Sequence, residues 1–139
     1  MTLQNAFTTF LQSEEANGFT DIRQISADLT IFSYSGIHFL YSYQADDPNV
    51  FRLIIPKVEL YREELIHRML DFTKRYKVAK VIELDDTIWF SYEQLVFNQK
   101  EGDYRLFKIA IKILTAMFRE WKENPSPATD STVETVDNR

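Results

Sequence analysis

The chain has 139 residues, a formal net charge of −5 and a hydrophobic content of 45%. This length fits one domain, and its 11 Phe and 7 Tyr supply enough apolar bulk for a core that needs no disulfide or metal. The absence of cysteine excludes a disulfide framework and a thiolate metal site. The acidic balance argues against a nucleic acid partner, because phosphate binding needs concentrated Lys and Arg.

The sequence also lacks the apolar segments that direct proteins into or across membranes. The N-terminal residues have neither a basic start nor a continuous apolar stretch, so they do not resemble a signal peptide. No run of 18 apolar residues occurs, so we expect no membrane insertion. With no cysteine in the chain, these features predict a cytoplasmic protein.

The first part of the chain predicts a helix followed by three strands. Apolar side chains at helical spacing indicate an amphipathic helix over residues 2–17. The period then changes to two, and residues 30–35 and 37–43 predict a hairpin across a Ser-Gly turn. Residues 51–55 follow as a third strand, which we expect Pro56 to end because proline cannot donate a hydrogen bond to a neighbouring strand.

The second part predicts two helices around another hairpin. Helical period returns over residues 60–76, with acidic residues near the start and basic residues near the end, as the helix dipole favours. Residues 79–84 and 87–96 predict a second hairpin. The last helix, over 104–122, has apolar residues that alternate spacings of three and four.

These elements predict an α+β fold in the order α-β-β-β-α-β-β-α. Two hairpin-rich blocks favour a mainly antiparallel five-stranded sheet, and three helices with one apolar face each imply a two-layer sandwich. We place this single domain at residues 1–123. Residues 124–139 contain almost no large apolar side chain, so we expect a disordered C-terminal tail.

The pattern resembles the YbjN family, a bacterial family described as sensory transduction regulators with a secretion-chaperone-like fold. The similarity lies in residues 50–56, in the helix through 69–72, and in residues 78–84 with the acidic pair 85–86 that follows. It covers roughly residues 2–122, essentially the whole domain. The resemblance implies a binding or regulatory role and supplies no catalytic residue.

No constellation of residues in the sequence indicates an active site. Glu64 and His67 have the spacing of one half of a di-iron site, but the second copy that such a site needs is missing. The acidic pairs at 46–47 and 85–86 are interpreted as turn residues. Three glycines leave no phosphate-binding loop. We therefore assign no catalytic residue, no metal ligand and no cofactor, and predict that the chain is not an enzyme.

The last helix carries a basic face formed by Arg105, Lys108, Lys112, Arg119 and Lys122. Each of these residues follows a residue of the apolar stripe by one position, so the cations flank the predicted buried face. One interpretation is a contact with an acidic partner, an anionic membrane surface or a phosphate backbone. The other is a docked helix whose long cationic side chains cover the margin of the core.

The less apolar face of the sheet is the candidate contact surface. Alternation places Leu40, Ile54, Val81 and Trp89 on this face. The richer core set on the opposite face is Phe39, Tyr41, Phe51, Leu53, Phe90 and Tyr92. An exposed Trp with aliphatic neighbours often marks a contact site. Alternatively, the first helix covers this face, or the apolar residues are scattered surface side chains.

These observations favour a non-enzymatic protein-binding or regulatory module. Such a protein would act as a chaperone-like adaptor that presents a sheet face or edge to an unidentified protein partner. The alternative is a structural homodimer that uses the same surface and has no separate ligand. A third interpretation is an enzyme of a type without a recognisable motif.

Overall fold

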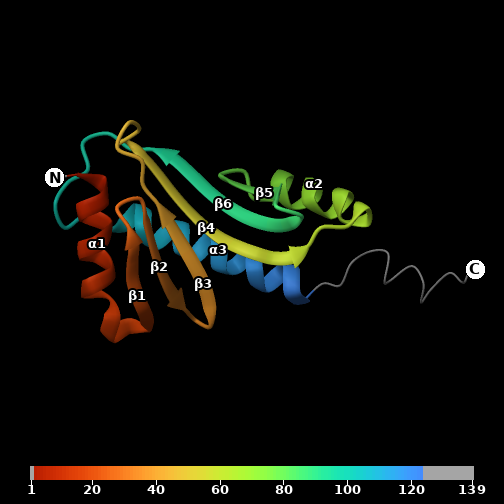
Figure 1. Cartoon of the computed structure of the whole chain (residues 1–139), viewed down its shortest axis with the longest axis horizontal. Coiled ribbons are helices and arrows are strands. Elements are labelled where there is room, and N and C mark those ends of the chain that lie inside the picture. The colour runs from red at the N-terminus through yellow and green to blue at the C-terminus, as the bar shows by residue number, and fades with distance from the viewer. Residues whose placement is uncertain (1, 124–139) are drawn as a thin grey trace, which may run out of the picture.

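The computed structural model describes residues 2–123, so the tail expected at 124–139 lies outside the described residues. Figure 1 shows how the helices and strands follow one another along the chain. The elements, with two short 3-10 turns labelled η, are α1 (Leu3–Ser13), η1 (Glu15–Asn17), β1 (Phe19–Ser26), β2 (Leu29–Tyr34), β3 (Ile37–Ser42), β4 (Val50–Leu60), η2 (Glu63–Leu65), α2 (Ile66–Arg75), β5 (Ala79–Leu84), β6 (Thr87–Leu95) and α3 (Arg105–Glu123).

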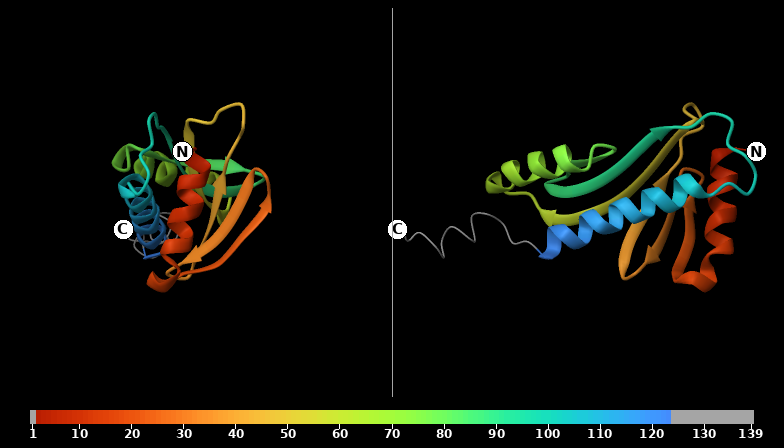
Figure 2. Two further views of the ribbon diagram at one scale, coloured as in Figure 1. Left: turned by 90° about the vertical axis from the view of Figure 1, so that its left-hand side faces the viewer. Right: turned by 180° about the vertical axis from the view of Figure 1, so that it is seen from behind.

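The strands form one antiparallel sheet of six, in the order β1-β2-β3-β4-β6-β5. All three helices lie on the same side of this sheet (Figure 2, left). Phe7 of α1 and Phe107 of α3 contact Phe51 of β4, and Phe72 of α2 lies against Phe90 of β6. The α+β class and the antiparallel sheet are therefore confirmed, and the predicted count of five strands was one too low.

Aromatic side chains fill the space between the helices and the sheet. The ring of Phe7 lies 4.4 Å from that of Tyr41 and 5.1 Å from that of Phe107, measured between centroids. Aromatic burial of this kind dominates core energetics, because each ring removes a large apolar area from water. The six strand residues predicted for the core face are all buried: Phe39, Tyr41, Phe51, Leu53, Phe90 and Tyr92.

The strand that the sequence analysis missed is β1, at one edge of the sheet. Only Phe19 is buried in it, and Ile22 is half-buried. Asp21 has a φ of 54°, and the pairing with β2 shifts register between Thr20 and Arg23. A bulged and mostly exposed strand has no regular alternation of apolar residues, so periodicity could not reveal it.

The prediction that Pro56 ends the third strand was wrong, because β4 continues to Leu60. The pairing of β4 with β6 shifts register between Ile55 and Glu59, and Lys57 has a φ of 50°. This bulge lets the ladder skip the proline, which has no N–H to donate, and resume beyond it. The second helix consequently begins later than predicted, after the short turn η2.

A polar cluster joins the end of α2 to α3. Glu120 of α3 accepts hydrogen bonds from the Tyr76 hydroxyl and from the Arg75 guanidinium. The Tyr76 hydrogen bond, together with the Arg75 charge, lowers the pKa of Glu120. Burial and the hydrogen bond to Glu120 raise the pKa of Tyr76 to about 12.

This cluster predicts a loss of stability in acid. A carboxylate whose pKa is lowered by folding stabilises the native state above its unfolded pKa, and this contribution disappears as pH falls through the folded pKa. We expect Glu120→Gln to lower the free energy of unfolding by about 1 kcal/mol at pH 7, the usual net value of a hydrogen bond. Urea unfolding should show the difference from wild type shrinking towards zero below about pH 4. If the difference in the free energy of unfolding between Glu120→Gln and wild type did not change with pH, the loss of stability would come from packing rather than from the charge of Glu120.

Candidate functional site

The face of the sheet opposite the helices, called here the outer sheet face, carries a band of apolar side chains. Leu40 of β3 pairs with Ile31 of β2 on one side and with Ile54 of β4 on the other. In the next strands, Trp89 of β6 pairs with Ile82 of β5. Paired residues on adjacent strands lie side by side on one face. On its other side Ile54 pairs with Ser91, which pairs with Lys80, so the apolar residues form one group on β2 to β4 and a second group on β5 and β6.

The band extends to the far end of the hairpin between β5 and β6. Leu60 and Leu84 both pair with Thr87, which lies between them. Leu60 is 71% exposed and Leu84 is 45% exposed, and Trp89 is half-buried. None of the described helices covers this face (Figure 2, left). Apart from Leu60 and Leu84, the apolar residues of this band are half-buried. Exposed apolar residues gathered on one face of a sheet are a feature of contact surfaces.

The polar groups of the outer sheet face are hydrogen-bonded within the domain. The Ser33 hydroxyl and the His38 Nδ1 atom lie 2.9 Å apart. Arg52 forms an ion pair with Glu93, whose carboxylate also lies 3.7 Å from the Lys80 amine. Because these groups already have partners, the face offers a ligand mainly apolar contact.

Three of the four predicted contact residues lie on the outer sheet face, and the fourth lies on the core face. Leu40, Ile54 and Trp89 share the outer sheet face, as predicted. Val81 instead pairs with Phe90 on the core face and is 8% exposed, so its assignment to the contact surface was wrong. The two-residue turn between β5 and β6 sets this register, because it pairs Leu84 with Thr87 and so fixes every later pair.

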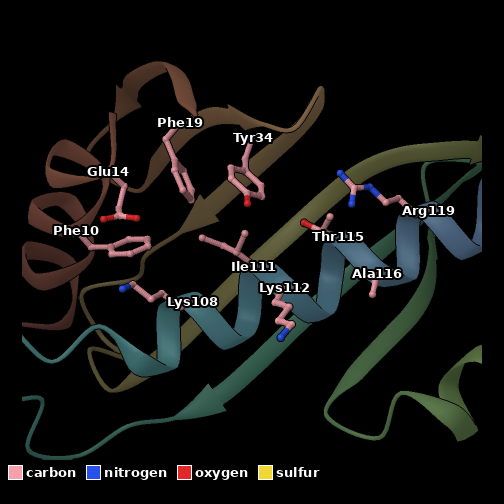
Figure 3. A pocket seen from close by; sticks show the side chains of 10 residues that line it. All are labelled: Phe10, Glu14, Phe19, Tyr34, Lys108, Ile111, Lys112, Thr115, Ala116 and Arg119. Carbon is pink, nitrogen blue, oxygen red and sulfur yellow. The ribbon is translucent and has the colours of Figure 1, made fainter. Parts of the chain in front are cut away.

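The basic face of α3 lies partly beside a cleft and partly in contact with its own domain. Arg105 binds the carboxylate of Asp103 at 2.8 Å, and the Lys122 amine donates to the Val58 carbonyl at 2.9 Å. The other three cations line a cleft of about 600 Å³ between α1, α3 and the strands β1 and β2, called here the α3 cleft (Figure 3). These three are Lys108, Lys112 and Arg119.

The acidic pairs and the Glu64–His67 pair considered in the sequence analysis are all exposed. The carboxylate with a strongly lowered pKa, of about 2, is Asp103, and its partner Arg105 is the cause. Glu64 and His67 are exposed on the turn and helix that follow β4. Within residues 2–123, no group of three His, Asp or Glu side chains could hold a metal ion. The acidic pair 85–86 forms a turn in which both residues have positive φ, as expected for a two-residue hairpin.

Comparison with protein families, curated proteins and solved structures finds no match to this chain. No helix in the described part of the chain is long and apolar enough to span a membrane.

Several residues of these surfaces escaped the sequence analysis. Leu60 lies beyond Pro56, where no strand was expected, and Leu84 and Ile82 were not among the residues placed on the contact face. A two-residue turn at 85–86 pairs Leu84 with Thr87 and therefore Ile82 with Trp89, which would have placed Ile82 on the outer sheet face. The sequence analysis identified the basic face of α3, which forms one side of the α3 cleft. It did not indicate the cleft itself, because the residues that line it lie far apart in the chain.

Proposed function

We propose that this domain is a non-enzymatic protein-binding module, an adaptor that holds a protein partner on the outer sheet face. The observation that supports the proposal is the apolar band from Ile31 to Leu84, which none of the described helices covers. The resemblance to the YbjN family is consistent with a binding or regulatory role. A partner with a matching apolar surface would bury the band and remove it from water.

The dimensions of the face fit a protein partner better than a small molecule. Six strands spaced about 4.8 Å apart give a face roughly 24 Å wide. Small ligands are usually enclosed in concave sites, whereas protein interfaces bury about 800 Å² on each partner. The outer sheet face is broad, and its ion-paired residues Arg52, Glu93 and Lys80 lie at one side of the apolar band. A homodimer through the same face is the second candidate.

Photo-crosslinking in the native cell tests the proposal. A photoreactive residue placed at Leu60 should form protein adducts, whereas one at Ile109 should not. Ile109 is a suitable control because it is also an exposed apolar residue, at 51% against 71%, but it belongs to α3 on the helical side. Equal labelling from the two positions, or none from Leu60, would contradict the proposal. An adduct of twice the chain mass would identify the homodimer.

A charge placed in the band should separate binding from folding. We expect Leu60→Asp to weaken the association at least tenfold, about 1.4 kcal/mol, because binding would bury the new carboxylate against an apolar surface without a partner. Its effect on the free energy of unfolding should stay within about 0.5 kcal/mol, as for other exposed positions. Ile109→Asp is the matched control for binding. Adduct yield and urea unfolding provide the two measurements.

A further inference from the structure

The α3 cleft combines an apolar floor with a cationic rim. Its floor includes Phe10, Phe19 and Ile111, all buried in the core of the domain. The rings of Phe10 and Phe19 lie 5.7 Å apart in an edge-on arrangement, and Phe19 stacks on Tyr34 at 4.5 Å. Because these side chains are fixed by the core, the cleft exists before any ligand enters. Its volume of about 600 Å³ is typical of a small-molecule site.

The rim of the cleft has an excess of positive charge. Lys108, Lys112 and Arg119 lie within about 40° of arc on α3 and extend roughly 16 Å along it, at 3.6 residues a turn and 1.5 Å a residue. Glu14 is the one carboxylate in the lining, so the side chains sum to 3 − 1 = +2. Within residues 2–123, neither lysine lies within ion-pair distance of a carboxylate.

A second, independent observation comes from Thr115 in the wall of the cleft. This residue is 7% exposed, and its hydroxyl oxygen has no hydrogen-bond partner among the described residues. Buried hydroxyl groups are normally paired, and a helical threonine commonly bonds the carbonyl four residues earlier. Figure 3 shows Thr115 and Arg119 at one end of the cleft and Phe10 and Glu14 at the other, with the stacked rings of Phe19 and Tyr34 between them.

We propose that the α3 cleft binds a small carboxylate with an apolar body, of the fatty acid class. The carboxylate would lie at the end formed by Arg119 and Thr115, and the hydrocarbon would lie against Tyr34, Phe19 and Ile111. Arg119 is exposed and donates to the Ser35 hydroxyl, so its long side chain can turn towards a ligand carboxylate in the cleft. Charge-assisted hydrogen bonds of this kind are about twice as strong as neutral ones.

Calorimetry with dodecanoate, below the concentration at which it forms micelles, tests the proposal on the full chain. We expect binding to dodecanoate and at least tenfold weaker binding to methyl dodecanoate, which has the same apolar body without the charge. Arg119→Gln should weaken dodecanoate binding about tenfold, equivalent to about 1.4 kcal/mol. Arg105→Gln should leave it unchanged, because Arg105 lies on the same helix but outside the cleft and binds Asp103.

Amide chemical shifts locate the ligand independently of affinity. Addition of dodecanoate should move the resonances of Phe19, Ile111 and Thr115 and leave those of the outer sheet face in place. Shifts confined to the outer sheet face, equal affinity for the ester, or no binding would each overturn the proposal. Binding of an acidic peptide in place of dodecanoate would overturn it as well. None of these results bears on the crosslinks from Leu60, so the two proposals fail separately.

Discussion

Replacing Trp121 with alanine should lower the free energy of unfolding by about 3–5 kcal/mol, the usual cost of truncating a buried aromatic residue. Trp121 is 2% exposed and lies at the meeting point of α2, α3 and β6. Its ring is 5.0 Å from that of Phe72 and 5.4 Å from that of Phe90, between centroids. Its Nε1 atom also donates to the Glu59 carboxylate at 2.7 Å. The substitution would remove both the packing and this hydrogen bond.

Two comparisons make the Trp121 result specific, both from urea unfolding at pH 7. Lys112→Ala on the exposed side of α3 should change the free energy of unfolding by no more than about 0.5 kcal/mol. Phe118→Ala should cost less than Trp121→Ala, because Phe118 is only half-buried at the margin of the core. If Trp121→Ala cost no more than Lys112→Ala, the packing of α3 on the sheet would be refuted.

The second large loss of stability is expected from substitution of Arg68, a buried charged residue of α2. Arg68 is 8% exposed, and its guanidinium lies over the Trp121 ring, 4.1 Å from the centroid. It donates to the Trp121 carbonyl oxygen and lies 3.9 Å from the Glu59 carboxylate. Arg68→Ala should cost about 2–4 kcal/mol, because it removes a desolvated cation–π contact and a charged hydrogen bond together.

The lysine variant separates charge from shape at this position. Arg68→Lys keeps the positive charge but loses the planar group that stacks on Trp121, so we expect an intermediate loss of stability. Urea unfolding followed by tryptophan fluorescence gives both the stability and the environment of Trp121. If Arg68→Lys matched wild type, stacking would contribute nothing. If Arg68→Ala were as stable as wild type, the contacts of Arg68 with Trp121 and Glu59 would not stabilise the fold.

The sequence predicted those parts of the fold in which side-chain periodicity reports burial. β3 and the first half of β4 alternate cleanly, so their core residues were correct. α3 matched its prediction to within a residue at each end, because its buried stripe is long. β1 has one buried residue and an irregular backbone, so no pattern could mark it. Arg68 could not be recognised either, since a cation on a helix is usually a surface residue.

The candidate surfaces depended on information that periodicity does not carry. Both faces of β5 have apolar residues, so alternation alone could not decide whether Val81 or Ile82 faces the core. The register of the hairpin places Val81 on the core face and Ile82 on the outer sheet face. The outer sheet face is uncovered because all the described helices pack on the other side of the sheet. No local sequence pattern predicts on which side a helix packs. The α3 cleft requires α1 and β2 to meet α3, a consequence of the tertiary fold.

The irregular course of β1 also bears on how molecules of this protein meet one another. An edge strand offers free N–H and C=O groups to any passing chain, and a regular edge beside an apolar face can seed fibrils. In β1, the positive φ of Asp21 and two register shifts interrupt the row of free groups, and Arg23 adds a charge. The bulged edge therefore hinders strand addition at β1, on the side of the sheet opposite to β5.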